Sequence, residues 1–372
     1  MSLYAKPFRQ MVEDVMKEMK EQSSQTSVID KYKSRINYVY STDLPVRATL
    51  DWMTAESTIS LVADYATGTV AVENGGTAIT LTDGTWAGLS SYSSSSSTLK
   101  IYISEDDELY DWYYTGATTG VISPAYLGAD DATESSYVVF KNTYDCPEDF
   151  LRPVDEFGFF VKENGHDVTA KWNSDEQWHA NVSRQPNDLP INYRIKPGRT
   201  SAGLQQVELS PPPDRARVLY TEYVKYMPNL VSFDADASAC TTTAASTSAT
   251  VTADITSKAT AGRYFKVDSD TSSDWRKISS SAYASPTTTI TLDSAYRVSN
   301  AGVETGFTIS DAPDMPHNQT NILFLGGCWL TSTEQNDSSK NIYLIKYEKA
   351  ISDAIAFENR KRYGSRRIGV AK

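Results

Sequence analysis

The chain has 372 residues, with 35 Lys and Arg against 47 Asp and Glu, and a formal net charge of -12. A chain of this length is expected to form two or three domains, and its acidic balance argues against a general binder of duplex DNA, which needs clustered cations. The first ten residues lack an apolar signal region and no segment approaches the roughly 20 apolar residues of a membrane span, so we expect no membrane partner.

The three cysteines, Cys146, Cys240 and Cys328, are far apart and lack metal-ligand spacing. An odd number of scattered cysteines without a secretion signal predicts reduced thiols in a cytosolic environment.

The N-terminal segment has the periodicity of helices. One apolar face is predicted from the spacing of Phe8, Met11, Val12, Val15, Met16 and Met19. A second helix is expected from about Ser27, where Ser27 and Asp30 resemble a capping box, with Val28, Tyr32, Ile36 and Val39 on its apolar face. Pro45 is expected to stop it, so the segment predicts a helical hairpin.

Two later segments share one pattern of short strands. "GTVAVENGGTAITLTDGTW" belongs to the first and "SATVTADITSKATAGRYFKV" to the second, and each continues with an acidic turn, a Trp-bearing strand and an Ala-Tyr pair. These features predict two small all-β modules related by a diverged internal duplication, over residues 68–145 and 234–310.

The rest of the chain completes the predicted architecture. Residues 146–233 indicate strands, of which 218–224 should be apolar on both faces. An apolar run over 321–330, interrupted by Gly326 and Gly327, precedes a helix whose predicted face is Leu344, Tyr347, Ile351, Ala354 and Ile355, with Gly364 after its end.

We therefore predict an α+β fold. Its discontinuous helical core would combine the N-terminal helical hairpin with the C-terminal helices, around a β-rich middle. The predicted core comprises residues 1–67, 146–233 and 311–372, and the two β-modules, 68–145 and 234–310, are inserted into its loops. Loops tolerate such insertions because only their closely spaced ends are constrained.

The sequence motifs predict no catalytic residue, no cofactor site and no metal site. The histidines His166, His179 and His317 are scattered, and the HExxH, CxxC and GxSxG patterns and a glycine-rich phosphate loop are absent. The segment from Asp268 to Asp274 resembles a calcium loop, but it has Ser where such loops need Gly and Glu. That segment and the acidic run 105–108 are interpreted as solvated turns.

The C-terminus is the most specific feature. A basic arm is formed by Arg360, Lys361, Arg362, Arg366, Arg367 and Lys372. The helix macrodipole accounts for cations in a last turn, but Arg366 and Arg367 lie beyond Gly364. We therefore expect a flexible arm that becomes ordered when its arginines bind carboxylates of a partner protein.

The order of these segments resembles the head-to-tail adaptor (connector) proteins of tailed bacteriophages. The resemblance covers most of the chain and is carried by "VELSPPPD" (207–214) with the following strand, "GRYFKV" (262–267) with Trp275, "TLDSAY" (291–296), and the helix from Tyr343 to Tyr363. The resemblance carries over no catalytic residue.

The resemblance implies a structural virion protein, made in the host cytoplasm and located at the head–tail interface. Such adaptors form a homo-oligomeric ring of usually about twelve copies beneath the portal protein, and their C-terminal arm docks into the portal. The ring passes genomic DNA through its channel without sequence-specific binding and offers a platform to tail nozzle or fibre proteins. The plainest members lack the two β-modules, whose role therefore stays open.

Two alternatives remain. The chain could be a tail nozzle or tail-fibre attachment protein, which the β-modules also fit. It could instead bind or depolymerise polysaccharide, using exposed tryptophans as sugar platforms. The candidates for such platforms are Trp86, Trp112, Trp172, Trp178 and Trp275.

Overall fold

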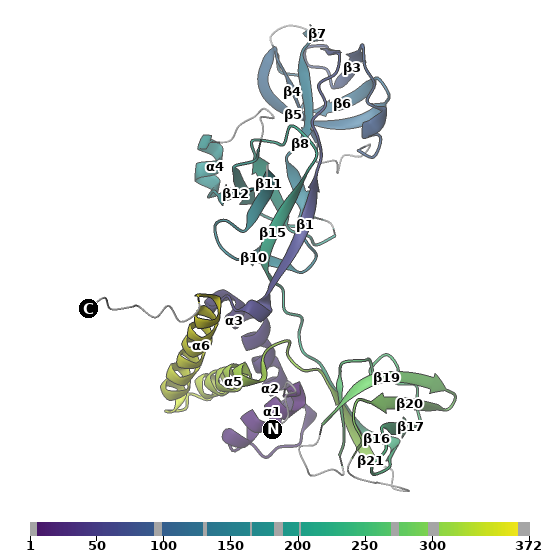
Figure 1. Cartoon of the computed structure of the whole chain (residues 1–372), viewed down its shortest axis with the longest axis vertical. Coiled ribbons are helices and arrows are strands. Elements are labelled where there is room, and N and C mark those ends of the chain that lie inside the picture. The colour runs from purple at the N-terminus through teal and green to yellow at the C-terminus, as the bar shows by residue number, and fades with distance from the viewer. Residues whose placement is uncertain are drawn as a thin grey trace, which may run out of the picture. The chain divides into compact units, whose positions relative to one another are not determined.

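The computed structural model describes residues 6–92, 99–128, 132–163, 166–181, 189–200, 202–268, 275–296 and 305–363. The chain divides into two compact units (Figure 1): unit 1 is Met1–Met53 with Met227–Lys372, and unit 2 is Thr54–Tyr226. The predicted division grouped the central strands with the terminal helices, whereas the contacts group residues 146–226 with the first β-module.

The fold is β-dominant, with 38% strand, 26% helix and three sheets in the described residues, so the predicted α+β fold around a helical core is wrong. The physical reason is that each sheet buries its own apolar cluster, and no member of these three clusters lies in an α-helix. The terminal helices therefore contribute no residue to these three cores.

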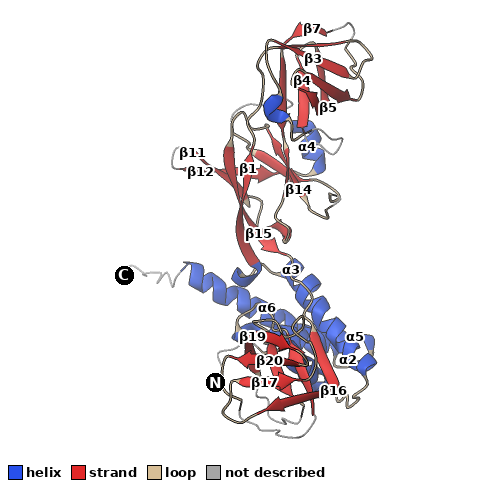
Figure 2. Ribbon diagram, turned by 90° about the vertical axis from the view of Figure 1, so that its right-hand side faces the viewer, coloured by secondary structure: helices blue, strands red, loops and turns tan. Residues whose placement is uncertain are grey.

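The helices of unit 1 come from both ends of the chain. Helix α5 packs against α1, α2 and α6, as Figure 2 shows in blue for α2, α5 and α6. The helices are α1 (Phe8–Glu18), α2 (Thr26–Tyr38), α3 (Leu44–Arg47), α5 (Asn321–Glu334) and α6 (Lys340–Tyr363), with a π-helical turn (Val39–Asp43) and 3-10 turns (Asp51–Met53 and His317–Gln319).

The predicted apolar face of α1 is confirmed, except that Met19 lies just past the helix end and is half-buried. The buried residues of α1 are Phe8, Met11, Val12, Val15 and Met16. This face follows from the i, i+3, i+4 spacing, which places all five side chains on one side of the helix.

The predicted boundaries of the second helix need correction. Its N-cap is Gln25, without a side-chain cap, and Asp30 pairs with Lys33 at 3.5 Å, so the predicted capping box is wrong. Pro45 does not end the helical path, because the backbone continues through the π-helical turn into α3, where Pro45 lies in the first turn. A first turn tolerates proline because its N–H groups have no intrahelical partner.

The second β-module is a closed barrel in unit 1. Its strands follow the spatial order β16-β17-β20-β19-β18-β21 and enclose Phe265, Ile290 and Phe307. The strands are β16 (Ser232–Thr242), β17 (Ser248–Val251), β18 (Tyr264–Val267), β19 (Arg276–Ala284), β20 (Thr287–Leu292) and β21 (Thr305–Ser310).

Unit 2 contains an eight-stranded sheet in the order β1-β15-β11-β12-β13-β14-β9, with β10 also paired to β15. Strand β15 carries apolar residues on both faces, as predicted, but their burial differs, because Leu219 and Val224 are buried whereas Val218 is 42% exposed. The elements are β1 (Thr54–Leu61), β9 (Thr143–Asp145), β10 (Phe150–Pro153), β11 (Phe159–Glu163), β12 (His166–Trp172), α4 (Asp175–Asn181), β13 (Asn192–Ile195), β14 (Gln206–Ser210) and β15 (Arg217–Lys225).

The first β-module is a seven-stranded sheet in the order β7-β2-β3-β6-β5-β4-β8. Trp86 and Trp112 meet edge to face in its core, with ring centroids 5.1 Å apart. The elements are β2 (Thr69–Val72), β3 (Ala78–Thr82), a 3-10 turn (Ala87–Leu89), β4 (Leu99–Ile103), β5 (Asp106–Gly116), β6 (Thr119–Ser123), β7 (Ala132–Ser135) and β8 (Tyr137–Lys141).

The two modules share one strand order. β2-β3-β6-β5-β4-β8 corresponds to β16-β17-β20-β19-β18-β21, and β7 and β8 together take the two pairings that β21 makes in the barrel. Tyr126 exchanges backbone hydrogen bonds with Gly75 and Gly76, and Tyr296, 170 positions later, does the same with Ala245 and Ser246. This agreement supports the predicted duplication.

Candidate functional site

The predicted arm lies mostly outside the described residues. Arg360, Lys361 and Arg362 belong to the last turn of α6, but their side chains are not described. Arg366, Arg367 and Lys372 fall outside the described part of the chain. The structure therefore leaves the arm as a prediction.

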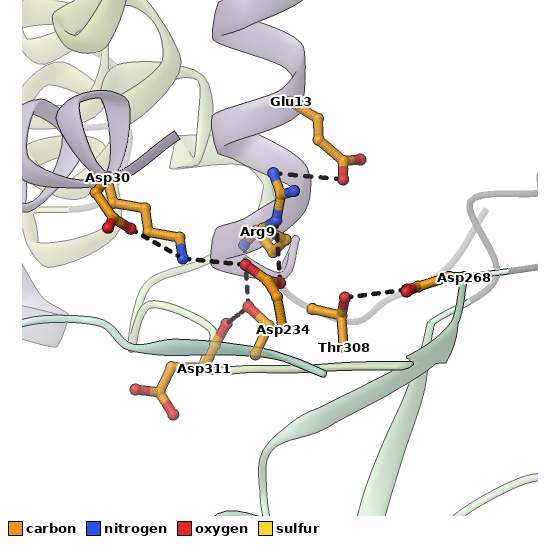
Figure 3. A network of polar contacts seen from close by, with 9 residues as sticks. Arg9, Glu13, Asp30, Asp234, Asp268, Thr308 and Asp311 are labelled. Atoms are coloured by element: carbon orange, nitrogen blue, oxygen red, sulfur yellow. Dashed lines mark hydrogen bonds and ion pairs between the residues drawn. The ribbon is translucent and has the colours of Figure 1, made fainter. Parts of the chain in front are cut away.

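A network of charges joins the helices to the barrel within unit 1 (Figure 3). One carboxylate, Asp234 at the start of β16, accepts from Arg9 of α1 and Lys33 of α2, both at 3.2 Å. Arg9 also pairs with Glu13 at 3.6 Å, and Lys33 with Asp30 at 3.5 Å. Because two cations, Arg9 and Lys33, pair with three carboxylates, the network keeps a formal charge of -1.

Backbone and side-chain hydrogen bonds hold the same end of the barrel, where the start of β16 pairs with the end of β21. The Phe8 N–H donates to the carbonyl of Asp311 at 2.8 Å, and the Arg9 N–H donates to the Ser310 hydroxyl at 2.9 Å. The Asp311 carboxylate accepts from Arg263 at 2.8 Å and from the Val231 N–H at 2.8 Å. The start of α1 is thereby bonded to both segments by which the chain enters and leaves the barrel, the start of β16 and the end of β21.

A groove lies beside this network, between α1, the loop before α2, the first turns of α2 and the start of β16. Its volume is about 810 Å³, within the range of ligand pockets. Met16, Ile29 and Phe233 provide apolar lining, while Lys17 and Lys20 lie on the α1 side. Sequence reasoning missed this site because its residues come from segments about 200 positions apart and share no motif.

A second polar cluster anchors the far end of α6. The Glu358 carboxylate, which is 6% exposed, accepts from the Asp51 N–H at 2.8 Å and from the Gln319 amide at 3.3 Å. The Trp52 indole N–H donates to Gln319 at 2.7 Å. Three segments distant in sequence therefore meet at one buried carboxylate.

Helix α6 buries one face and exposes apolar residues elsewhere. Tyr347, Ile351 and Ala354 are buried, which confirms the centre of the predicted face, whereas Ile342, Ile345 and Phe357 are 55%, 65% and 56% exposed. On the neighbouring helical path, Val46 is 77% exposed and Tyr38 49% exposed. We call these five exposed residues the outer apolar set.

An aromatic stack joins α3, α5 and α6. Trp329 of α5 stacks on Tyr347 of α6 at 5.6 Å, and the guanidinium of Arg47 lies 5.5 Å from the Trp329 ring. Tyr347 donates to the Asp43 carboxylate at 2.7 Å, and burial raises the pKa of its hydroxyl. The stack holds α3, α5 and α6 at a defined spacing.

The five tryptophans that were candidates for sugar binding differ in how deeply they are buried. Trp86, Trp112 and Trp178 are buried at 0%, 0% and 2% exposure, so they pack in cores and offer no platform. Trp275 is partly buried, while Trp172 is 45% exposed at the end of β12. Burial therefore removes three of the five residues on which the polysaccharide alternative rested.

The acidic turns and histidines form no metal site in the part of the chain that the structure describes, where no group of three or more His, Cys, Asp or Glu is placed for one. Asp268 accepts from the Thr308 hydroxyl at 3.3 Å, and the rest of its calcium-like segment, 269–274, lies outside the described residues. His166 and His317 are exposed, and the side chain of His179 is not described.

All three cysteines are free and buried, at 3% exposure for Cys146, 1% for Cys240 and 0% for Cys328. Burial raises the pKa of each thiol to about 12. Such thiols are poor nucleophiles at neutral pH.

None of the helices in the described residues is both long and apolar enough to cross a membrane.

Comparisons with known proteins identify no family. No protein-family model matches the chain, and no curated protein matches it. Among solved structures it is similar to translation elongation factor SelB from Methanococcus maripaludis in complex with the GTP analogue GppNHp, at 8% identity and a TM-score of 0.15. That match covers 70% of this chain and 63% of the SelB chain, less than two thirds of its length. Similarity this weak supports no conclusion about fold or activity.

Proposed function

We propose that this chain is a structural subunit of a virion, a head-to-tail adaptor that forms a ring under the portal. The observation that carries the proposal is the outer apolar set of unit 1. A helix that buries one face and still exposes Ile342, Ile345 and Phe357 has apolar surface left for another protein. In a ring, that surface would contact the next copy.

The position of α6 fits this role. The helix is anchored by Glu358 near its end, and the basic arm follows directly, so a rigid element would present the arm to the portal. Arginines on such an arm suit carboxylates of a partner, because the guanidinium forms paired hydrogen bonds with them. The sequence resemblance to adaptor proteins points in the same direction.

The charge distribution suits a DNA channel. Unit 2 has 12 Lys and Arg against 25 Asp and Glu, a formal charge of -13, whereas unit 1 has 23 against 22. An acidic surface repels the phosphate backbone, so DNA would pass it without being retained.

The deciding experiment is native mass spectrometry of the protein, alone and mixed with the cognate portal ring. We expect a complex with one copy of this chain per portal subunit. Deletion of residues 364–372 should abolish that complex while the circular dichroism spectrum stays unchanged. If the folded full-length chain gives no complex, portal docking is wrong and the nozzle or fibre-attachment alternative takes its place.

The ring interface has its own test. Ile345→Asp puts a charge in the outer apolar set and should prevent assembly of the ring on the portal. Val218→Asp is the matched control, because Val218 is also an exposed apolar residue but lies in unit 2. Equal assembly by both variants would remove α6 from the interface.

A further inference from the structure

We propose that strand β1 of unit 2 binds a basic, extended segment of a partner protein, which joins the sheet as an added strand. The inference goes beyond the adaptor proposal and does not depend on it. It rests on an open backbone edge, on the regularity of that edge, and on two glutamates that face each other beside it.

β1 is a terminal strand of the eight-stranded sheet, next to β15 (Figure 1). Along an antiparallel edge strand, every second residue directs its N–H and C=O away from the neighbouring strand. In the part of the chain that the structure describes, residues 55–60 form backbone hydrogen bonds with no segment other than β15. β9 approaches just beyond the end of the strand, where the Val62 N–H donates to the Tyr144 hydroxyl at 3.2 Å. The backbone of residues 55–60 is therefore open to a further strand.

The edge lacks the features that usually protect one. Natural proteins interrupt long edge strands with proline, lysine or a β-bulge, or keep such strands very short. β1 has eight residues without proline or lysine, and its register with β15 runs unbroken from Thr54 to Leu61. At the other end of the same sheet, β9 has only three residues. Main-chain hydrogen bonds along β1 would therefore provide affinity for an extended segment.

Two carboxylates give this edge its charge. Glu56 of β1 lies directly opposite Glu222 of β15, and both side chains are exposed. Among the described residues, no cation forms an ion pair with either carboxylate. Like charges directly opposite each other destabilise a sheet. A Lys or Arg on an added strand would lie next to Glu56 and reduce this repulsion, so the edge favours a basic partner.

The cations on the neighbouring strands are engaged elsewhere. Lys162 of β11 places its ammonium 4.6 Å from the centre of the Tyr220 ring, and the register of β11 with β15 places it further from Glu222 than Tyr220 is. The guanidinium of Arg152 on β10 donates to the Pro153 carbonyl at 3.2 Å. Unit 2 as a whole has 12 Lys and Arg against 25 Asp and Glu, so its surplus charge is negative.

The opposite face of β1 sets the alternation of the partner. Ala55 and Ile59 are half-buried and pack against the core of the sheet. Side chains of a strand alternate between its two faces, so a fitting segment alternates basic residues with apolar ones. A second copy of β1 does not fit, because it contains no Lys or Arg. The basic arm fits less well, since Arg366 and Arg367 are adjacent and a strand would direct them to opposite faces.

The test is a fluorescence anisotropy titration of the full chain with a fluorescein-labelled peptide, TRVKVRVT. The comparison peptides are TRPKPRPT, which has the same charges but lacks backbone N–H groups for a ladder, TEVEVEVT, and SRRIGVAK, the sequence of the chain's own arm. We expect TRVKVRVT to bind at least tenfold more tightly than each of the other three. Equal binding of the proline peptide would show attraction by charge alone, and tighter binding of SRRIGVAK would assign the edge to the arm of a second copy. Either result, or no binding of TRVKVRVT, overturns the proposal.

Variants locate the site. Glu56→Lys with Glu222→Lys should weaken binding of TRVKVRVT at least tenfold. Glu73→Lys with Asp167→Lys is the matched control, because it changes two exposed acids of unit 2 outside β1 and β15 and alters the net charge equally. We expect the control to bind within twofold of the wild type, and hydrogen exchange within residues 55–60 to slow when the peptide binds. Equal weakening by both variants, or unchanged exchange, contradicts the assignment. Melting curves confirm that each variant is folded.

Discussion

Gly326 sets how closely α5 approaches the turn after α2. A Cβ atom at this position would lie 2.6 Å from one γ-carbon of Val39 and 2.9 Å from the other. Real Cβ atoms do not approach neighbours that closely, so the absence of a side chain permits the packing of these segments. The sequence predicts that Gly326 and Gly327 interrupt the apolar run, whereas both lie inside α5 and are buried.

Gly326→Ala should therefore destabilise the protein by about 1–2 kcal/mol, because overpacking outweighs the gain of roughly 1 kcal/mol that Ala brings to a helix. Chemical denaturation measures the change. Val39→Ala in the same chain should recover part of the loss, while Gly88→Ala, where a Cβ meets nothing within 4 Å, should change stability little. A neutral Gly326→Ala variant would contradict the packing argument.

Arg35 is a charged residue buried at 5% exposure between α2 and α5. It donates to Thr331 at 3.0 Å and to the Glu334 carboxylate, and its guanidinium lies 5.0 Å from the Tyr32 ring. The hydrogen bond from Arg35 is the main cause that lowers the pKa of Glu334 below its usual value.

A carboxyl whose pKa is lower in the folded state stabilises the fold above its unfolded pKa of about 4.3, and this contribution is lost as the pH falls through the folded pKa. Since Glu334 is 50% exposed, we expect its pair with Arg35 to contribute only about 0.5–1 kcal/mol at pH 7. Glu334→Gln should lower the free energy of unfolding at pH 7 and match the wild type near pH 2. Urea titrations at both pH values check this, and a difference that persists at pH 2 would argue against the ion pair.

At the scale of elements, α6 is held by one buried carboxylate near its C-terminal end. Glu358 accepts from Asp51 and Gln319, which belong to segments more than 260 positions apart. Loss of a buried acceptor removes both of these hydrogen bonds, and this costs more than loss of an exposed pair.

Glu358→Ala should cost about 2–4 kcal/mol and raise hydrogen exchange in the last turns of α6. Glu348→Ala is the matched control on the same helix, because Glu348 is 55% exposed and pairs with Arg47 at 3.6 Å. We expect that control to stay within about 0.5 kcal/mol of the wild type. Similar exchange in both variants would show that Glu358 does not anchor the helix.

The elements differ in how well sequence patterns predicted them. The faces of α1 and α6 were predicted from helical periodicity. The likeness of the two β-modules was predicted from repeated short phrases, whereas their strand order was not. The continuation of the helical backbone past Pro45 was not predictable, because the π-helical turn before it depends on the residues that pack around it. The exposure of Val218 was not predictable, because apolar composition cannot say which part of a sheet is covered.

At the scale of the whole molecule, the fold rests on separate cores. The barrel core includes Cys240, and the core of the eight-stranded sheet includes Cys146, while Cys328 lies in α5. The three buried thiols therefore report on three different regions, and each becomes reactive only when its own region opens.

Native protein should react with a maleimide at all three thiols far more slowly than after unfolding, by roughly a hundredfold or more. In a denaturant series, peptide mass spectrometry should find Cys146 labelled at a different midpoint from Cys328, because they belong to separate units. Single-cysteine variants provide the controls. A common midpoint for all three would indicate one cooperative unit.

The sequence by itself determined the local features, namely the terminal helices, the two repeated β-modules, the basic arm and the absence of familiar catalytic motifs. Periodicity and composition are properties of neighbouring residues, so a single chain is enough to read them. Only the tertiary structure decided that the sheets carry their own cores and that Arg9, Lys33 and Asp234 meet beside a groove. These features depend on contacts between segments about 200 positions apart, which no local pattern encodes.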